Sequence, residues 1–204
     1  MRPKIQKTAR HFRRIPHWVF LSLFVFFSLV AVFALRQNNL TMVHLREAVY
    51  KADKDNGDVN TALNNLRSYV YGHMNTNLSS GGNTIKPPIQ LKYTYERLQT
   101  AEQQRINGVN SKVYTEAENY CQSQIPEGFS GRGRVPCVTD YVTTHGVKAN
   151  AIPAALYQFD FANPAWSPDF AGWSLLLAII FLLAFLANVV IDKILGAYIQ
   201  TQEI

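Results

Sequence analysis

The chain has 204 residues, and its hydrophobic residues (48%) are concentrated in two uninterrupted blocks instead of being spread through one core. It carries a formal net charge of +6, from 20 basic and 14 acidic residues. The whole excess lies in the first 15 residues, which contain no acid; the basic residues there are Arg2, Lys4, Lys7, Arg10, Arg13 and Arg14. A basic tail before a neutral remainder is typical of a membrane-facing segment and gives no support to a nucleic-acid-binding domain.

The first apolar block runs from Pro16 to Leu35 and contains no charged residue. At about 1.5 Å per residue, a helix of this length matches a hydrocarbon core of about 30 Å, so we predict a transmembrane helix at 16–35. A cleavable signal peptide is the alternative, because it also joins a basic segment to an apolar one, and Val32-Phe33-Ala34 resembles a cleavage site. The block is longer than the apolar stretch of a usual signal peptide, which favours a membrane span.

The second apolar block, from Trp173 to Ile191, is also uncharged and predicts a second transmembrane helix. The basic tail places the amino terminus in the cytoplasm, and two spans return the carboxyl terminus to the same side. Trp18, Trp166 and Trp173 suit the membrane interfaces as anchors. We therefore expect a basic cytoplasmic tail (1–15), a first span (16–35), an extracytoplasmic helical domain (36–172), a second span (173–191) and a short cytoplasmic tail (192–204).

Heptad spacing of apolar residues after Leu35 predicts that the first span continues outside the membrane as a helical stalk to about Lys54. Turn residues follow at 53–58, where the glycine and glutamate positions do not fit a calcium-binding EF-hand. The next helix has apolar residues at helical spacing and should fold back antiparallel on the stalk. The candidate interface seam of this hairpin consists of Met42, Leu45, Val49, Val59, Leu63, Leu66 and Val70.

The third predicted helix spans about 90–124 and ends before Pro126 and Gly128. Its apolar face is thin and rich in small residues, so it buries little area, at about 25 cal/mol per Å2. Three helices with narrow seams make a weak isolated core, which suggests burial against a second copy of the chain or against another protein. A monodisperse, cooperatively melting monomer of residues 36–170 would contradict this hypothesis.

The two cysteines are Cys121, at the end of the third helix, and Cys137, near the start of a short fourth helix. Both lie in the predicted extracytoplasmic domain, where disulfides persist, so we predict one disulfide between them. Pro136 suits the first position of the fourth helix. A metal site would need more ligands, and a catalytic thiol would need a nearby base that the spacing does not reveal.

From Ile152 to Asp169 the chain alternates prolines, aromatic residues and acids. This segment is too apolar for a free linker and too broken for a long helix, so we expect it either along the membrane face or packed back on the helical domain. Ser167, Pro168 and Asp169 have the order of a cap, a first-turn proline and a first-turn acid, which predicts the start of the second span.

No pattern in the sequence predicts a catalytic site, a cofactor or a metal. The histidines are scattered without ligand spacing, and no phosphate-binding glycine loop or nucleophile motif is present. His73-Met74-Asn75 lies at the end of the second helix. Its role is either a ligand contact or, more simply, capping and packing of the helix end. Asn188 is the strongly polar residue of the second span, where its amide either hydrogen-bonds across helices or reaches water at the cytoplasmic end.

Several strings resemble an uncharacterised group of small two-pass membrane proteins from candidate-phyla bacteria such as Saccharibacteria. They are Asn56-Gly57-Asp58-Val59, Tyr71-Gly72-His73-Met74-Asn75-Thr76, Pro87-Pro88-Ile89-Gln90-Leu91-Lys92-Tyr93, Phe159-Asp160-Phe161, Trp166-Ser167-Pro168-Asp169 and Ala171-Gly172-Trp173. The resemblance implies a bacterial cell envelope and transfers no activity. The architecture is also similar to the extracytoplasmic helical sensor domains of chemoreceptors and sensor kinases. Residues 192–204 are too few for a kinase or methylation domain, so we expect any signal to pass to a separate protein.

The sequence therefore predicts a mainly α protein in which two transmembrane helices flank an extracytoplasmic antiparallel helical bundle, with the first span continuous with a stalk. We expect a non-enzymatic scaffold or assembly subunit in the bacterial cytoplasmic membrane. Its partners would be the lipid bilayer and either further copies of the chain or a different membrane protein. The alternative is a ligand-sensing module that binds a small molecule between the helices. No cofactor and no nucleic-acid partner are expected.

Overall fold

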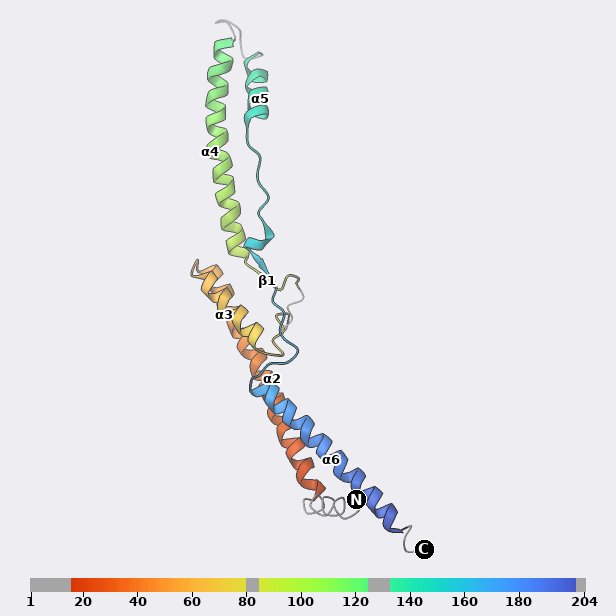
Figure 1. The fold of residues 1–204 in the computed structure, drawn as a ribbon. Coiled ribbons are helices and arrows are strands. Elements are labelled where there is room, and N and C mark those ends of the chain that lie inside the picture. The colour runs from red at the N-terminus through yellow and green to blue at the C-terminus, as the bar shows by residue number, and fades with distance from the viewer. Residues whose placement is uncertain (1–15, 80–84, 125–132, 201–204) are drawn as a thin grey trace. The chain divides into compact units, whose positions relative to one another are not determined.

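The computed structural model describes residues 16–79, 85–124 and 133–200, with the side chains of the last helix described up to Ile194. Its described part is mainly helical, as predicted (Figure 1). The predicted basic tail (1–15) and the helix-ending residues Pro126 and Gly128 lie outside the described residues. The elements in chain order are α2 (His17–Lys54), α3 (Val59–Gly72), β1 (Ile89–Gln90), α4 (Lys92–Gln124), α5 (Arg134–His145), the 3-10 helix η1 (Ala154–Leu156), β2 (Gln158–Phe159) and α6 (Phe170–Gln200).

The chain divides into two compact units. Unit 1 contains the chain up to Val49, the segment Val59–Ile85 and the chain from Asp160 onward. Unit 2 contains Tyr50–Asp58 and Lys86–Phe159. Unit 1 therefore holds most of α2 together with α3 and α6, whereas unit 2 holds the end of α2 with β1, α4, α5, η1 and β2.

Of the described helices, α2 and α6 are long and apolar enough to cross a membrane. α2 has 38 residues and no break, so the predicted continuation of the first apolar block into a longer helix is confirmed. At about 1.5 Å per residue its length is about 57 Å, nearly twice the thickness of a hydrocarbon core. α6 begins at Phe170 and ends at Gln200, so it extends beyond the predicted span 173–191 at both ends.

The two apolar helices pack against each other within unit 1. The rings of Phe27 on α2 and Phe181 on α6 stack with centroids 5.5 Å apart, and those of His17 and Phe185 lie 6.4 Å apart. Small residues are buried along both helices. These buried small residues are Ala31 and Ala34 on α2 and Ala171, Ser174 and Ala178 on α6.

Unit 2 contains the long helix α4, the short helix α5 and the predicted disulfide. Cys121 on α4 and Cys137 on α5 are joined, with their Cα atoms 6.0 Å apart, so this prediction is confirmed. α5 begins at Arg134, two residues earlier than expected, and Pro136 is therefore its third residue instead of its first. Gly133 precedes the helix, and its carbonyl accepts a bond from the Cys137 amide, which draws the residues before Pro136 into the first turn.

The first part of the segment before α6, up to Phe159, belongs to unit 2, and the rest belongs to unit 1. β2 pairs antiparallel with β1, with Ile89 opposite Phe159 and Gln90 opposite Gln158. The Leu91 amide adds a bond of 2.8 Å to the carbonyl of Tyr157. The sequence analysis did not predict these strands. They have two residues each, which is too short to show an alternating pattern.

Candidate functional site

A hydrogen-bonded cluster in unit 1, partly buried, joins three segments that are distant in the sequence, and we call it the polar junction. Its members are Asn38 on α2, Met74 and Asn75 just after α3, and Ser167 and Asp169 just before α6. Asn38, Met74 and Ser167 are buried, with exposed fractions of 9%, 8% and 1%. Because polar groups removed from water need partners, their hydrogen bonds decide what the junction can do.

Side-chain hydrogen bonds link all three segments of the polar junction. The Asn38 Nδ2 group donates to Asp169 Oδ2 at 2.7 Å and to the Met74 carbonyl at 3.3 Å. The Met74 amide donates to Ser167 Oγ at 2.9 Å, and Asn75 Nδ2 donates to the carbonyl of Leu35 at 3.0 Å. The junction therefore fixes the end of α3 and the start of α6 on the same part of α2.

The end of α3 is shaped by residues 73–75. Asn75 adopts a φ of 61°, a left-handed conformation that asparagine tolerates better than most residues. The ring of His73 stacks on that of Tyr69 at 4.0 Å, and its Nδ1 atom lies 2.9 Å from the Tyr69 carbonyl. These are the contacts of a helix end, in agreement with the capping interpretation of this segment.

The start of α6 differs in one detail from the predicted one. Asp169 is the N-cap, because its Oδ1 atom accepts a bond from the Gly172 amide at 2.9 Å. Ser167, which was expected to cap this helix, is engaged with Met74 instead. Since α6 begins at Phe170, the residue directly before it takes the cap position. A Cβ atom at Gly172 would collide with the Ser167 carbonyl, so this turn requires glycine.

An apolar layer adjoins the polar junction. Ala34, Met74 and Ala171 form one buried cluster, against which Leu35 and Leu175 pack. Each of the three segments contributes to this layer. The junction is therefore held by apolar packing as well as by hydrogen bonds.

The Asp169 carboxyl is stabilised in its charged form. Burial raises its pKa, but hydrogen bonds from the Gly172 amide and from Asn38 and Ser167, together with nearby His73, outweigh burial and lower the pKa below the ordinary value. A carboxylate at this position also interacts favourably with the amino-terminal end of α6. The polar groups of the junction thus bond to one another, and the chemistry of this arrangement is to position three segments.

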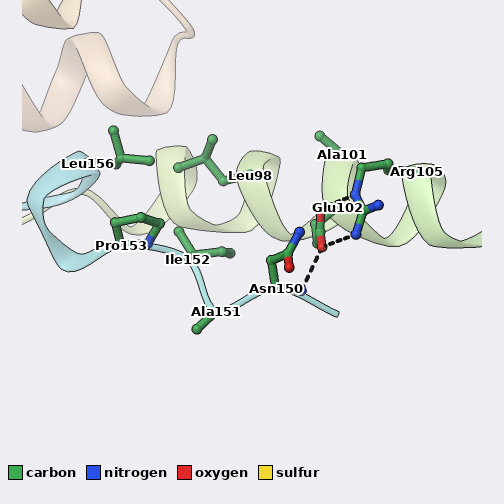
Figure 2. Close-up of a pocket in the computed structure, with 9 residues that line it drawn as sticks. All are labelled: Leu98, Ala101, Glu102, Arg105, Asn150, Ala151, Ile152, Pro153 and Leu156. Carbon is green, nitrogen blue, oxygen red and sulfur yellow. Dashed lines mark hydrogen bonds and ion pairs between the residues drawn. The ribbon is translucent and has the colours of Figure 1, made fainter. Parts of the chain in front are cut away.

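A second candidate site is an open pocket of about 320 Å3 in unit 2, between α4 and the segment that precedes β2. Figure 2 shows α4 contributing the side chains on one side of the pocket and residues 150–156 those on the other. The apolar lining is Leu98, Ala101, Ala151, Ile152, Pro153 and Leu156, and the polar lining is Glu102, Arg105 and Asn150.

The polar end of this pocket is an ion pair. Arg105 donates to Glu102 through Nε at 2.7 Å and through Nη2 at 2.8 Å, and the Asn150 amide donates to Glu102 at 2.7 Å. The bond from Arg105 and then that from Asn150 lower the pKa of Glu102 to about 2. The same bond from Glu102 raises the pKa of Arg105. These charges are directed at each other, which leaves the apolar wall as the surface open to a ligand or partner.

Asp53 has a role in unit 2 that the sequence analysis missed. It was assigned to a turn after the stalk, but its carboxylate, 2% exposed, accepts bonds from the amides of Tyr93 and Thr94 at 3.0 and 2.7 Å. The Thr94 hydroxyl and Arg97 Nη2 donate to the same carboxylate. Asp53 thus caps the start of α4 from 40 residues away. The sequence around Asp53 does not indicate that its carboxylate caps a helix so distant in the chain.

The residues of the predicted seam are largely buried inside the chain. Leu45 and Val59 are partly buried, and the remaining five are at most 4% exposed. Their contact with a second copy stays a prediction. The five buried ones are Met42, Val49, Leu63, Leu66 and Val70.

The other predicted residues lie on α2 and on or just before α6. Asn188 is 4% exposed, and its Nδ2 atom has no hydrogen-bond partner among the residues that the structure describes. Trp18, Trp166 and Trp173 are exposed by 65%, 44% and 53%. Among residues 16–79, 85–124 and 133–200, no three histidine, cysteine or acidic side chains gather as a metal ion would require.

Comparison with known proteins found no match to this chain among family models, curated proteins or solved structures.

Proposed function

We propose that this protein is a non-enzymatic scaffold or assembly subunit of a bacterial cell envelope, anchored by two membrane spans. The observation that carries the proposal is the sparse burial of α4. This helix has 33 residues, and among them only Val113, Ala117 and Cys121 are buried. A long helix that its own chain leaves largely uncovered is suited to contact another molecule.

The exposed side chains of α4 and α5 support an interaction surface. Tyr114, Tyr120 and Val135 are exposed by 52%, 50% and 66%. Tyrosine is enriched in protein interfaces, because its ring supplies contact area and its hydroxyl a hydrogen bond. We infer that exposed side chains of α4 and α5 contact a second copy of the chain or a different envelope protein.

The proposed arrangement has both termini in the cytoplasm and the segment between the two spans outside. The basic tail supports this orientation through the positive-inside rule. The proposed antiparallel hairpin of α2 and α3 is supported by two bonds in unit 1. Arg46 Nη1 donates to the Leu78 carbonyl at 2.6 Å, and Asn75 donates to that of Leu35, so the chain after α3 returns along α2.

The second candidate function is a ligand-sensing module, and the pocket beside Glu102 favours it. A solute bound there would raise the free energy of unfolding by RT ln(1 + [L]/Kd) and would thereby raise the melting temperature. The pocket is open and its charges already pair with each other, which favours an apolar side chain of a partner over a charged solute. We therefore rank the scaffold first.

The test is photo-cross-linking of the full chain in its native membrane. A photoreactive phenylalanine analogue replaces Tyr114 or Tyr120 on α4 and, as the matched control, Tyr71 on α3, which is similarly exposed at 56%. The proposal predicts adducts of higher mass from positions 114 and 120 and none from position 71. Mass spectrometry then distinguishes multiples of this chain from a second protein. Recovery of uncross-linked monomer from positions 114 and 120 would contradict the proposal.

A further inference from the structure

Two sets of exposed side chains lie at the level of the polar junction. On the α6 side are Trp166, Phe170 and Trp173, of which Phe170 is 71% exposed. The two indole rings lie edge to face with their centroids 6.0 Å apart. On the α2 side is Arg36, which is exposed and lies between Ala34, in the apolar layer, and Asn38, in the polar junction.

Arg36 is the first charged residue along the exposed apolar face of α2. Leu29 and Val32, exposed by 67% and 65%, precede it at steps of seven and four residues, a spacing that places all three on one side of a helix. Arg36 makes no ion pair with another residue in the described part of the chain. Its guanidinium is therefore free to meet a group from outside the chain.

We propose that these residues form a collar that binds the phosphate groups of membrane phospholipids where α2 and α6 leave the bilayer. In this collar Arg36 and the indole N–H groups donate to lipid phosphate oxygens, while Phe170 enters the upper acyl chains. The inference rests on the proposed membrane anchoring and adds to it the chemical class of ligand and the residues that hold it.

The surroundings of the collar favour a lipid over a soluble anion. Both sets continue the exposed apolar faces of α2 and α6, so a molecule that binds Arg36 lies beside an apolar surface. Arginine binds phosphate through two parallel hydrogen bonds, and tryptophan prefers the interface of a bilayer. Gly172 also contributes, because a Cβ atom there would lie only 2.9 Å from Trp166 Nε1. The absence of a side chain at 172 lets the Trp166 indole lie against α6.

The depth of the collar is tested by quenching of tryptophan fluorescence in vesicles. The full-length Trp18→Phe protein retains Trp166 and Trp173 as its only tryptophans. It is placed in phosphatidylcholine vesicles whose acyl chains are brominated either near the headgroup or near the bilayer centre. We expect stronger quenching by the shallow bromines. Stronger quenching by the deep bromines, or none by either, would overturn the collar.

The phosphate contact is tested with an anionic lipid. Binding of fluorescent phosphatidylglycerol to the protein in neutral nanodiscs should weaken about fivefold in Arg36→Gln, since one basic residue near a membrane surface contributes about that factor. Arg36→Lys should retain most of the binding. Lys112→Gln, which removes a charge from exposed α4, should leave it unchanged. Equal losses in Arg36→Gln and Lys112→Gln, or full competition by inorganic phosphate, would overturn the proposal.

A separate measurement distinguishes this inference from the membrane anchoring beneath it. Release of the protein from membranes by alkaline carbonate would overturn both, because no span would then exist. Retention in the membrane with no effect of Arg36→Gln would overturn the collar alone. The cross-links from positions 114 and 120 depend on neither result.

Discussion

α3 and α4 bury the same number of residues, although their lengths differ by more than twofold. α3 has 14 residues and buries Leu63, Leu66 and Val70, whereas α4 has 33 and buries Val113, Ala117 and Cys121. α3 belongs to unit 1, where a polar junction joins its end to α2 and α6. In unit 2, α4 is held by the Asp53 cap, the disulfide, the contact of Glu102 with Asn150, the paired hydrogen bonds between Asn110 and Val147, and ring contacts with α5 and Tyr157. α3 is therefore buried more densely along its length than α4, which is held by separate contacts.

The largest effect is expected from removing the Asp53 carboxylate. Asp53→Ala removes the acceptor of two amides and of the Thr94 hydroxyl and takes the carboxylate from Arg97, which keeps its bond to the carbonyl of residue 53; it should destabilise the protein by about 4 kcal/mol through the lost cap and charged hydrogen bonds. Thermal unfolding followed by circular dichroism measures the change. Asp55→Ala, at an exposed neighbouring position, is the matched control and should change little. Equal melting of the two variants would remove the claim that α4 depends on this cap.

Removal of the disulfide should cause the second largest loss of stability. Cys121→Ser opens a loop closed across 16 residues, which corresponds to about 3 kcal/mol in the chain-entropy model. Melting of the wild type in reductant should shift in the same direction, while Cys121→Ser itself should not respond to reductant. A wild-type melting curve that reductant leaves unchanged would contradict the prediction.

The polar junction should tolerate the loss of one member better. Asp169→Ala removes the cap of α6 and the partner of Asn38, but the apolar layer of Ala34, Met74 and Ala171 remains. We expect a loss of about 2 kcal/mol in unfolding free energy, measured in nanodiscs. Asp160→Ala, an exposed acid in the same unit, serves as the control. A loss larger than that of Asp53→Ala would reverse the comparison between the units.

The smallest expected effect on stability is its pH dependence, which arises from Glu102. Its folded pKa of about 2 lies below the ordinary 4.5, so the unfolded state binds the proton more readily. The stability from this carboxylate is therefore present above about pH 4.5 and is lost as the pH falls toward about 2. Carboxyl NMR titration of the wild type should place the midpoint well below 4.5, and Arg105→Gln should return it toward that value. A wild-type midpoint at the ordinary value would show that the ion pair does not persist in solution.

The sequence predicted the features that depend on local pattern. The two uncharged blocks predicted the apolar helices, and the heptad spacing predicted the continuation of α2 beyond the first block. The two cysteines predicted the disulfide. The short strands and the Asp53 cap escaped prediction because each joins segments tens of residues apart through two or three groups. The polar junction was not predicted for the same reason, because the residues around Asn38 and around Asp169 do not indicate that the two side chains contact each other. The cap of α6 was misplaced by two residues because serine and aspartate fit that position equally well.

The proposed scaffold function requires that a partner covers α4 in the native membrane. Amide hydrogen exchange, read by mass spectrometry, tests it on the full-length protein in native membranes and on the purified protein in nanodiscs. We predict slower exchange along α4 in native membranes and equal exchange along α3, which its own unit already covers. Equal exchange along α4 in both settings would show that the helix is as uncovered in the cell as it is alone, and would contradict the proposed scaffold function.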